Sequence, residues 1–376
     1  ESVRGKATDP GRTHLPQETG RAPATRAAGS ESATAAPAYV PPFLDACRGN
    51  PVPFTPVWVM RQAGRYLPEY RAIREKVDFL TLTKTPDLAA EVTLQPIRRF
   101  GMDAAILFSD IMTPVEGMGI QLDFAPGPVI GNPVRSPEDV DRLSVADPYE
   151  TVPFVMETIR ILREELPVSA PLIGFAGAPW TLFCYAVEGK GSKTFIGAKS
   201  FLFAEPAAGQ TLLAKLADTM IAYLRAQAEA GAQALMIFDS WAGALPVRAL
   251  RQWSLEPLKR IVAALKARHP EVPVILFPRG AGLLYLDFAA ESGAEGLSLD
   301  SNLPPAWAAE ALSPQVTLQG NLDPLYLVAG GSAMDAAAEE ILSAFEQRPF
   351  IFNLGHGVVP QTPPENVERL LKVIRG

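Results

Sequence analysis

A regular alternation of short apolar runs with helical segments constrains the fold of this chain more than any other feature. Eight runs of three to five residues are bounded by Gly, Pro or Asp, and they cover 57–60, 104–108, 172–175, 234–238, 274–277, 296–299, 316–318 and 350–353. Short, continuously apolar runs of this kind are typical of parallel strands that are buried on both faces. The sequence therefore predicts eight parallel strands.

Helical patterns fill the intervals between these runs. Thr85 and Pro86 predict the start of one helix and Gly101 its end, and Pro96 inside it predicts a kink or a break. Amphipathic spacing predicts a longer helix over 210–230.

The last helix is predicted to end near Arg375. Thr362, Pro363 and Glu365 have the spacing of a capping box, which predicts where that helix begins.

Eight strands alternating with helices predict a single (β/α)₈ TIM barrel, an α/β fold, over residues 39–376. An open, doubly wound sheet is the alternative on pattern alone. No GxGxxG motif follows the first strand to support that alternative.

Residues 1–38 show no apolar periodicity and are dominated by Ala, Ser, Thr, Gly, Pro and Arg. Such a segment buries too little apolar surface to offset its conformational entropy, so we expect a disordered tail. Two interpretations stay open, the remnant of an organelle transit peptide and a featureless tail. Glu1, Asp9, Glu18 and Glu31 argue against the first, because transit peptides are poor in acidic residues.

Composition excludes several classes of function. The 376 residues carry a formal net charge of −7, which leaves no electrostatic footprint for binding nucleic acid. No run approaches the roughly 18 apolar residues of a membrane span. Cys47 and Cys184 are too few for a disulfide framework and indicate a reducing compartment. An acidic chain that binds an anionic ligand must gather its cations locally.

Glycine and polar residues are concentrated just after the predicted strands, where the active sites of barrels form. The segments are RQAGRY (61–66), SDIM (109–112), AGAPWT (176–181), DSWAG (239–243), PRGAG (278–282), DSN (300–302), GNLDP (320–324) and GHG (355–357). Part of this enrichment is turn chemistry, because Gly and Asp also end strands.

Arg61 and Arg65 are the most informative of these residues. They lie four positions apart, and Gly64 frees the backbone between them, so two guanidinium groups can point into one cavity. A guanidinium fork binds a carboxylate through two parallel charge-assisted hydrogen bonds. The pair therefore predicts a carboxylate-binding site, and a surface ion pair with Glu69 or Glu75 is the alternative.

Four further residues are candidates, each with a structural alternative. Asp110 is expected at the barrel mouth, where it either accepts N–H groups from a ligand or caps the next helix. Tyr185 lies in an apolar helix start, where a place in the core is the default. Ser240 and His356 are polar residues in loops after strands, and a lone histidine is more often a hydrogen-bonded structural residue than a catalyst.

Two long segments resemble the signatures of the uroporphyrinogen decarboxylase family. They are PVWVMRQAGRYLPEY (56–70) and GFAGAPWTLFCYAVEG (174–189), and FDSWAG, GNLDP and NLGHGV follow in the family's order. The resemblance covers residues 41–376. It implies an enzyme that decarboxylates the four acetate arms of uroporphyrinogen III to methyls, giving coproporphyrinogen III and four CO₂ in heme and chlorophyll biosynthesis.

The resemblance also implies roles for individual residues. Arg61 and Arg65 would bind substrate carboxylates, with Gln62 between them, and Asp110 would hydrogen-bond the central pyrrole N–H groups. The other residues that would contact the substrate are Phe238, Tyr185, Ser240 and His356. Catalysis would fall to Asp110, Arg61 and Tyr185. The DSN at 300–302 departs from the tryptophan that many members place after the aspartate.

The family further implies a homodimer. If the tail is the remnant of a transit peptide, a plastid location is expected, because photosynthetic cells make tetrapyrroles in plastids. A cytoplasmic location is the alternative.

Loss of CO₂ from an acetate arm leaves a carbanion, which requires an electron sink. No lysine stands out as a Schiff-base former and no metal site is readable, so we expect neither cofactor nor metal. A pyrrole that is protonated at its α-carbon becomes its own sink, and Asp110 would stabilise the positive charge. Arg61 and a bound water are both open as the proton donor.

Two other functions are compatible with the same scaffold. A zinc or cobalamin-linked methyltransferase needs a His-x-Cys and a later Cys to hold zinc, and Cys184 has no His two residues before it. A non-catalytic tetrapyrrole-binding protein would keep the same arginines, so only turnover distinguishes it.

Overall fold

Seven parallel strands form one curled sheet in the computed structural model, which describes residues 39–376. Their spatial order follows the chain, β1-β4-β5-β6-β7-β8-β9. The strands are β1 (Ala105–Ile106), β4 (Leu172–Gly177), β5 (Ala234–Asp239), β6 (Val274–Pro278), β7 (Gly296–Ser298), β8 (Thr317–Leu322) and β9 (Phe350–Leu354). Each matches one of the predicted runs, and the sequential order confirms the TIM-barrel-like fold over the doubly wound alternative.

The eighth predicted strand, 57–60, closes the sheet but forms no ladder. Val57 makes one parallel bridge to Phe352 of β9, and the Trp58 N–H donates to the Phe352 carbonyl over 3.3 Å. On the other side, next to β1, the Asp103 N–H donates to the Val57 carbonyl and its Oδ2 accepts from the Val57 N–H, both at 2.9 Å. The strand ends at once because Asn353 Oδ1 accepts the Met60 N–H and the chain then turns away.

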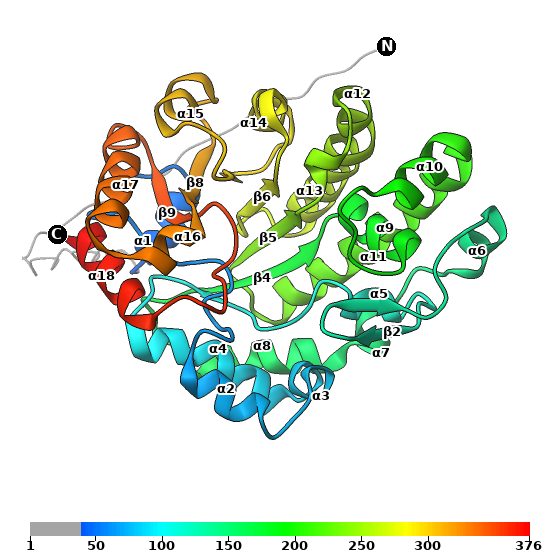
Figure 1. Cartoon of the computed structure of the whole chain (residues 1–376), viewed down its shortest axis with the longest axis horizontal. Coiled ribbons are helices and arrows are strands. Elements are labelled where there is room, and N and C mark those ends of the chain that lie inside the picture. Colours follow the sequence, from blue (N-terminus) through cyan, green and yellow to red (C-terminus); the bar gives the residue numbers. More distant parts are fainter. Residues whose placement is uncertain (1–38) are drawn as a thin grey trace, which may run out of the picture. The chain divides into compact units, whose positions relative to one another are not determined.

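Helices cover the outside of the curled sheet (Figure 1). They are α1 (Pro42–Cys47), α2 (Pro68–Arg74), α3 (Phe79–Lys84), α4 (Pro86–Phe100), α5 (Thr113–Glu116), α6 (Pro137–Arg142), α7 (Pro148–Thr151), α8 (Pro153–Glu165), α9 (Pro179–Glu188), α10 (Ile196–Ala204), α11 (Pro206–Ala230), α12 (Val247–Leu250), α13 (Glu256–Arg268), α14 (Tyr285–Glu291), α15 (Pro305–Ala311), α16 (Pro324–Ala329), α17 (Gly331–Ala344) and α18 (Pro364–Arg375). Short 3₁₀ turns cover Ala242–Ala244 and Gly282–Leu284, and Arg251–Leu255 is a π-helical turn. No helix among the described residues is long and apolar enough to cross a bilayer.

Helix α4 confirms its predicted ends, and of the kink or break predicted at Pro96 the break is absent. It begins after Thr85 and stops at Gly101, whose φ of 62° is the left-handed conformation that favours glycine. The helix runs through Pro96 because most of its residues are buried, and that packing outweighs the hydrogen bond that a proline removes.

The predicted capping box of α18 is wrong. Pro363 is the N-cap and Pro364 the first helical residue, and no side chain caps the helix start. Two prolines preset the backbone of this first turn, and the side chain of Thr362 is buried without a hydrogen-bond partner. A small antiparallel hairpin, β2 (Leu122–Phe124) with β3 (Pro128–Ile130), was not predicted.

Polar side chains cross-link the barrel interior. Trp58 Nε1 donates to Gln319 Oε1 over 2.9 Å, and Gln319 Nε2 donates to Ser298 Oγ over 3.1 Å. These bonds tie the closing segment to β7 and β8 and satisfy groups that are shielded from water.

Loss of the Asp103 side chain should destabilise the contact that closes the barrel. Replacing Asp103 with Ala removes the acceptor of the Val57 N–H, and the free energy of unfolding should fall by about 1–3 kcal/mol because a shielded donor loses its partner. Urea denaturation measures the change. Asp103→Asn keeps an acceptor and should lose less, and Asp141→Ala on an exposed face is the control. An Asp103→Ala variant as stable as the control would contradict this role.

Candidate active site

The carboxyl ends of the strands gather the charged residues that the sequence singled out. Arg61 keeps an exposed surface, but desolvation by its neighbours lowers the pKa of its guanidinium, and the charges of Tyr185, Arg65, Asp110 and Arg279 act on it as well. These side chains come from four loops or helices, so residues far apart in the sequence share one electrostatic environment. The predicted convergence at the barrel rim is therefore present.

Arg61 sits in a strained backbone conformation. Its φ is 61°, in the left-handed region that residues other than glycine seldom adopt. Its side chain lies on Gly357, where an added Cβ would stand 2.4 Å from Arg61 Cδ. The second glycine of the GHG segment therefore leaves the space that the guanidinium arm occupies.

Gln62 has a different place from its two arginine neighbours. Its side chain is buried, Nε2 donates to the Ala104 carbonyl over 3.0 Å, and Oε1 accepts from the Val59 N–H over 3.2 Å. The Tyr66 hydroxyl donates to the Gln62 carbonyl over 2.8 Å. The amide thus holds the arginine loop in place by its bonds to the backbone.

The surface ion pair considered for Arg61 and Arg65 does not form. Among residues 39–376, neither arginine has a carboxylate within ion-pair distance, and Glu69 instead pairs with Arg99 at 3.2 Å. Arg65 is exposed. Both guanidinium groups are therefore available to an anionic ligand.

Asp110 follows β1 and is half-buried at the rim. Its Oδ1 accepts the Met112 N–H over 2.7 Å, but Met112 is the N-cap of α5 and no side chain caps that helix, so the capping alternative is wrong. Burial raises the pKa of Asp110 to about 6, while the Met112 N–H and the nearby Arg61 work against that rise. A carboxylate with this pKa changes charge in the range where enzymes operate.

Aromatic rings line the site on the side of β4, β5 and β6. The ring of Phe238 packs edge to face against Phe175 and Phe277, with centroids 5.7 and 6.2 Å away. Tyr185 packs against Trp241 in the same manner at 6.3 Å. Burial raises the pKa of the Tyr185 phenol, and the charge of Asp110 raises it further. Such a wall suits the face of a flat, apolar ring.

His356 lies beside Phe277, with ring centroids 6.3 Å apart. Burial lowers its pKa to about 3, and the charges of Arg61 and Arg279 lower it further. The imidazole is therefore neutral at physiological pH, and it can offer one N–H donor and one acceptor but no positive charge.

Ser240 is held in place by a buried carboxylate. Asp239 accepts hydrogen bonds from the hydroxyls of Thr181 and Ser254, and the backbone N–H of Trp241 donates to Thr181 Oγ1 over 3.2 Å. Burial raises the pKa of Asp239 to about 6. These bonds fix the loop after β5 against α9.

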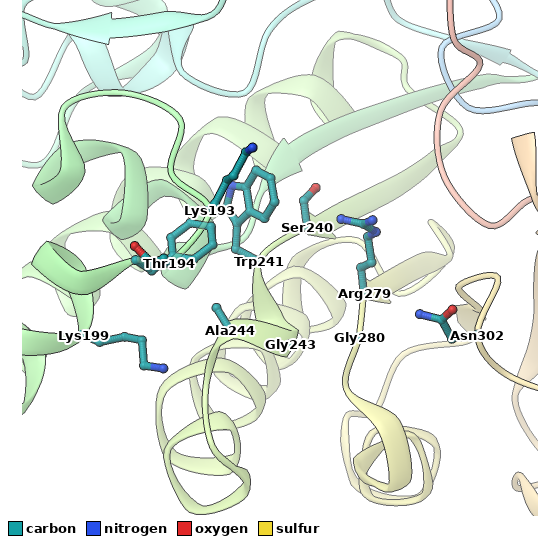
Figure 2. A pocket seen from close by; sticks show the side chains of 11 residues that line it. Lys193, Thr194, Lys199, Ser240, Trp241, Gly243, Ala244, Arg279, Gly280 and Asn302 are labelled. Carbon is teal, nitrogen blue, oxygen red and sulfur yellow. The ribbon is translucent and has the colours of Figure 1, made fainter. Parts of the chain in front are cut away.

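Arg279 is the functional candidate that the sequence reasoning missed. It directly follows β6, its side chain is half-buried, and its charge acts on both Arg61 and His356. The PRGAG segment is one of the predicted strand ends. It carries the same signal as Arg61, an arginine directly after an apolar run. Figure 2 shows Arg279 near Ser240 at the edge of a cavity.

Metal ligands are not grouped in the part of the chain from Tyr39 onward. No three His, Cys, Asp or Glu side chains there are placed to hold a metal ion. Cys47 and Cys184 are both buried, and burial raises the pKa of each thiol.

Comparison with known proteins covers nearly all of the described chain. A family model described as "Uroporphyrinogen decarboxylase (URO-D)" matches residues 40–376. A protein of Rhodospirillum rubrum named uroporphyrinogen decarboxylase is 50% identical over 337 residues, which are 89% of this chain and 97% of that protein. A protein of the same name from Granulibacter bethesdensis is 51% identical over 340 residues, 89% and 98% of the two chains.

Among solved structures, a methyltransferase from Methanosarcina mazei is similar with a TM-score of 0.74. The match covers 88% of this chain and 96% of that one, at 24% sequence identity. At this identity the likeness concerns the fold alone.

His356 supplies a test of the electrostatics of the site. Because its pKa is about 3, the ring carbon signals of His356 should not move between pH 5 and 8, whereas an unperturbed imidazole titrates near 6.5. A ¹³C-resolved NMR titration measures this. The signal is assigned by its loss in His356→Asn, and a midpoint between 6 and 7 would show that burial and the two arginines do not lower the pKa of this ring.

Proposed function

The chain belongs to the uroporphyrinogen decarboxylase family, and from that membership we propose how the residues at its barrel rim carry out the reaction. The protein is a carboxy-lyase of tetrapyrrole biosynthesis that acts on uroporphyrinogen without a cofactor. Four acetate arms become methyls, each by the exchange of CO₂ for a proton. One observation carries the assignment of residues: the charges of Asp110 and Arg61 act on each other at the strand ends, and those of Arg65 and Arg279 act on Arg61 as well.

Arg61 and Arg65 bind carboxylates of the substrate. Neither is paired with an acid in the described chain, and a guanidinium keeps its charge at any physiological pH. Gln62 positions them through its bonds to the backbone of Val59 and Ala104. One loop, tied to the backbone beside β1, therefore presents two cations to an octa-anionic substrate.

Asp110 stabilises the positive charge that the ring acquires. Protonation of a pyrrole at the α-carbon next to the acetate-bearing carbon gives a cation, and that cation accepts the electron pair of the breaking C–CO₂ bond. The methylene left on the ring takes up a proton and the α-carbon loses one, so the net change is one proton gained and one CO₂ lost. A preorganised carboxylate in a site shielded from water is most effective against such a charge.

Arg61 and a bound water are the two candidates for the proton donor, and each would act close to the Asp110 carboxylate. Tyr185 lies close enough to Arg61 and Asp110 for their charges to act on its phenol. It contacts the pyrrole ring whose positive charge Asp110 stabilises. Phe238 packs against the macrocycle, and Ser240 and neutral His356 offer uncharged hydrogen bonds.

Two finer features stay predictions. We expect a homodimer with facing clefts, as in the family, and a plastid location with a role in chlorophyll synthesis, the cytoplasm being the alternative. The two relatives compared above are bacterial. The transit-peptide interpretation and the disordered tail both concern residues 1–38, which lie outside the described residues.

The activity itself is tested by anaerobic incubation with uroporphyrinogen III in the absence of any added cofactor. Products are oxidised and separated by carboxyl number. A ladder that descends from eight carboxylates to four, with and without a chelator, is expected. Well-folded protein that binds the tetrapyrrole without loss of carboxylate would instead support the non-catalytic alternative.

Asp110→Asn tests the charge at nearly constant shape. Turnover should fall by about 10²–10³-fold or more, because the cationic intermediate loses its counter-charge. Asp123→Asn, an exposed acid in the hairpin, is the matched control and should keep full activity. Near-normal turnover in Asp110→Asn would refute the role.

The pH profile gives a second test of Asp110. Its ionised form is the active one, so kcat/KM should fall about tenfold per pH unit as pH drops below about 6, where the carboxyl gains a proton. The residual activity of Asp110→Asn should lack this limb. Titration of the substrate's own carboxylates affects both enzymes alike, so a limb shared by the two would rule out Asp110 as its origin.

A further inference from the structure

A cavity of about 420 Å³ lies beside the candidate active site. It opens between the loop that precedes α10, the loop after β5 and the loop after β6 (Figure 2). The residues that define its character are Lys193, Lys199, Ser240, Trp241, Arg279 and Asn302. Of these, only Ser240 belongs to the site residues that the sequence identified.

Positive charge distinguishes this cavity. Lys193, Lys199 and Arg279 line it, and no acidic side chain does. Within residues 39–376 none of the three has a carboxylate within 4.0 Å, whereas Lys84, Lys259 and other surface cations do. An acidic chain that leaves three cations unpaired around one cavity creates a local site for anions.

Specific contacts hold the lysine loop against the cavity. Phe195 adopts a left-handed φ of 53°, and its ring packs on Trp241 with centroids 5.1 Å apart. The Phe195 N–H donates to Ser192 Oγ over 2.9 Å, and the Ala198 N–H donates to Glu188 Oε1 over 2.9 Å. Hydrogen bonds therefore hold the loop at both ends, and the Phe195 ring packs its middle against Trp241.

Arg279 connects the cavity to the reaction centre. Its N–H donates to the Asp239 carbonyl over 3.1 Å, and its carbonyl accepts from the Gly243 N–H over 2.9 Å. Gly243 and Gly280 touch so closely that a Cβ on Gly243 would lie 2.9 Å from the Gly280 carbonyl oxygen. The two loops therefore form one rigid wall, and the guanidinium on it faces both the cavity and Arg61.

We propose that this cavity is a second carboxylate-binding pocket, which holds acetate or propionate arms of the tetrapyrrole that are not reacting. The inference rests on the proposed function and extends it to the cavity beside the candidate active site. The physical reason lies in the reaction: a cation on the reacting carboxylate stabilises the ground state and slows loss of CO₂, whereas cations on distant arms anchor the ring without that penalty. Arg61 and Arg65 cannot supply all of these contacts to a substrate with eight carboxylates.

The test compares neutral variants of the cavity lysines with a matched control. Lys193→Gln/Lys199→Gln removes two charges from the wall, and Lys190→Gln removes an exposed charge that does not line the cavity. The double variant should raise the KM for uroporphyrinogen III by about tenfold and change kcat by less than about twofold, because uniform binding is lost. Its KM should also depend less on salt than that of the wild type.

Two variants of Arg279 test whether its positive charge is what binds the substrate. Arg279→Gln should raise KM in the same manner, and Arg279→Lys, which keeps the charge, should restore most of the affinity. A lysine double variant with the KM and salt dependence of Lys190→Gln would overturn the proposal, and so would a loss confined to kcat.

Failure of the proposed function is distinguishable from failure of the pocket. If the wild type shows no turnover, the function fails, and the pocket is then tested alone by fluorescence titration with uroporphyrin. A dissociation constant about tenfold higher in the lysine double variant than in Lys190→Gln supports the pocket, and equal constants refute it.

Discussion

Closure of the parallel sheet is the constraint on which the rest of the structure depends. Parallel strands in one sheet point the same way, so a closed sheet brings the carboxyl ends of all strands to one rim. The closing contact is small: Val57 bridges Phe352 on one side and exchanges two hydrogen bonds with Asp103 on the other. The loop that carries Arg61 leaves the barrel directly after this contact. Closure therefore sets the position of the principal cation as well as the shape of the sheet.

The electrostatics of the rim follow from crowding charges where water is partly excluded. Desolvation alone raises the pKa of Asp110 and lowers that of Arg61, and their mutual attraction opposes both changes. His356 remains neutral because burial disfavours its charged form, and because the charges of Arg61 and Arg279 make a third positive charge there unfavourable. The result is a carboxylate, Asp110, that lies close to the permanent cation of Arg61, whose charge also acts on the neutral imidazole of His356. This arrangement suits a reaction in which an anionic substrate passes through a ring cation.

The aromatic wall and the cationic cavity divide the recognition of the substrate between them. Phe238 and its neighbours offer apolar faces to the macrocycle, while unpaired cations offer partners to its carboxylates. Two glycines leave the space that this arrangement of aromatic and cationic side chains requires. Gly357 leaves room for the Arg61 side chain, and Gly243 lets the loops after β5 and β6 touch. Side chains at either position would move the cations that they flank.

The sequence by itself determined the order of strands, the class of fold and the segments that meet at the rim. It could do so because buried parallel strands require apolar runs, and because a barrel places the residue after each run at the same end. The family signatures added the substrate and the residues that bind it. Local patterns failed where prolines start a helix without a side-chain cap, as in α18, or where a polar side chain replaces a ladder, as at Asp103 beside Val57. Only the tertiary structure decided which charges interact, because a pKa depends on neighbours that the chain brings from far away. Arg279 is separated from Arg61 by more than half of the chain, and no local pattern shows that both act on His356.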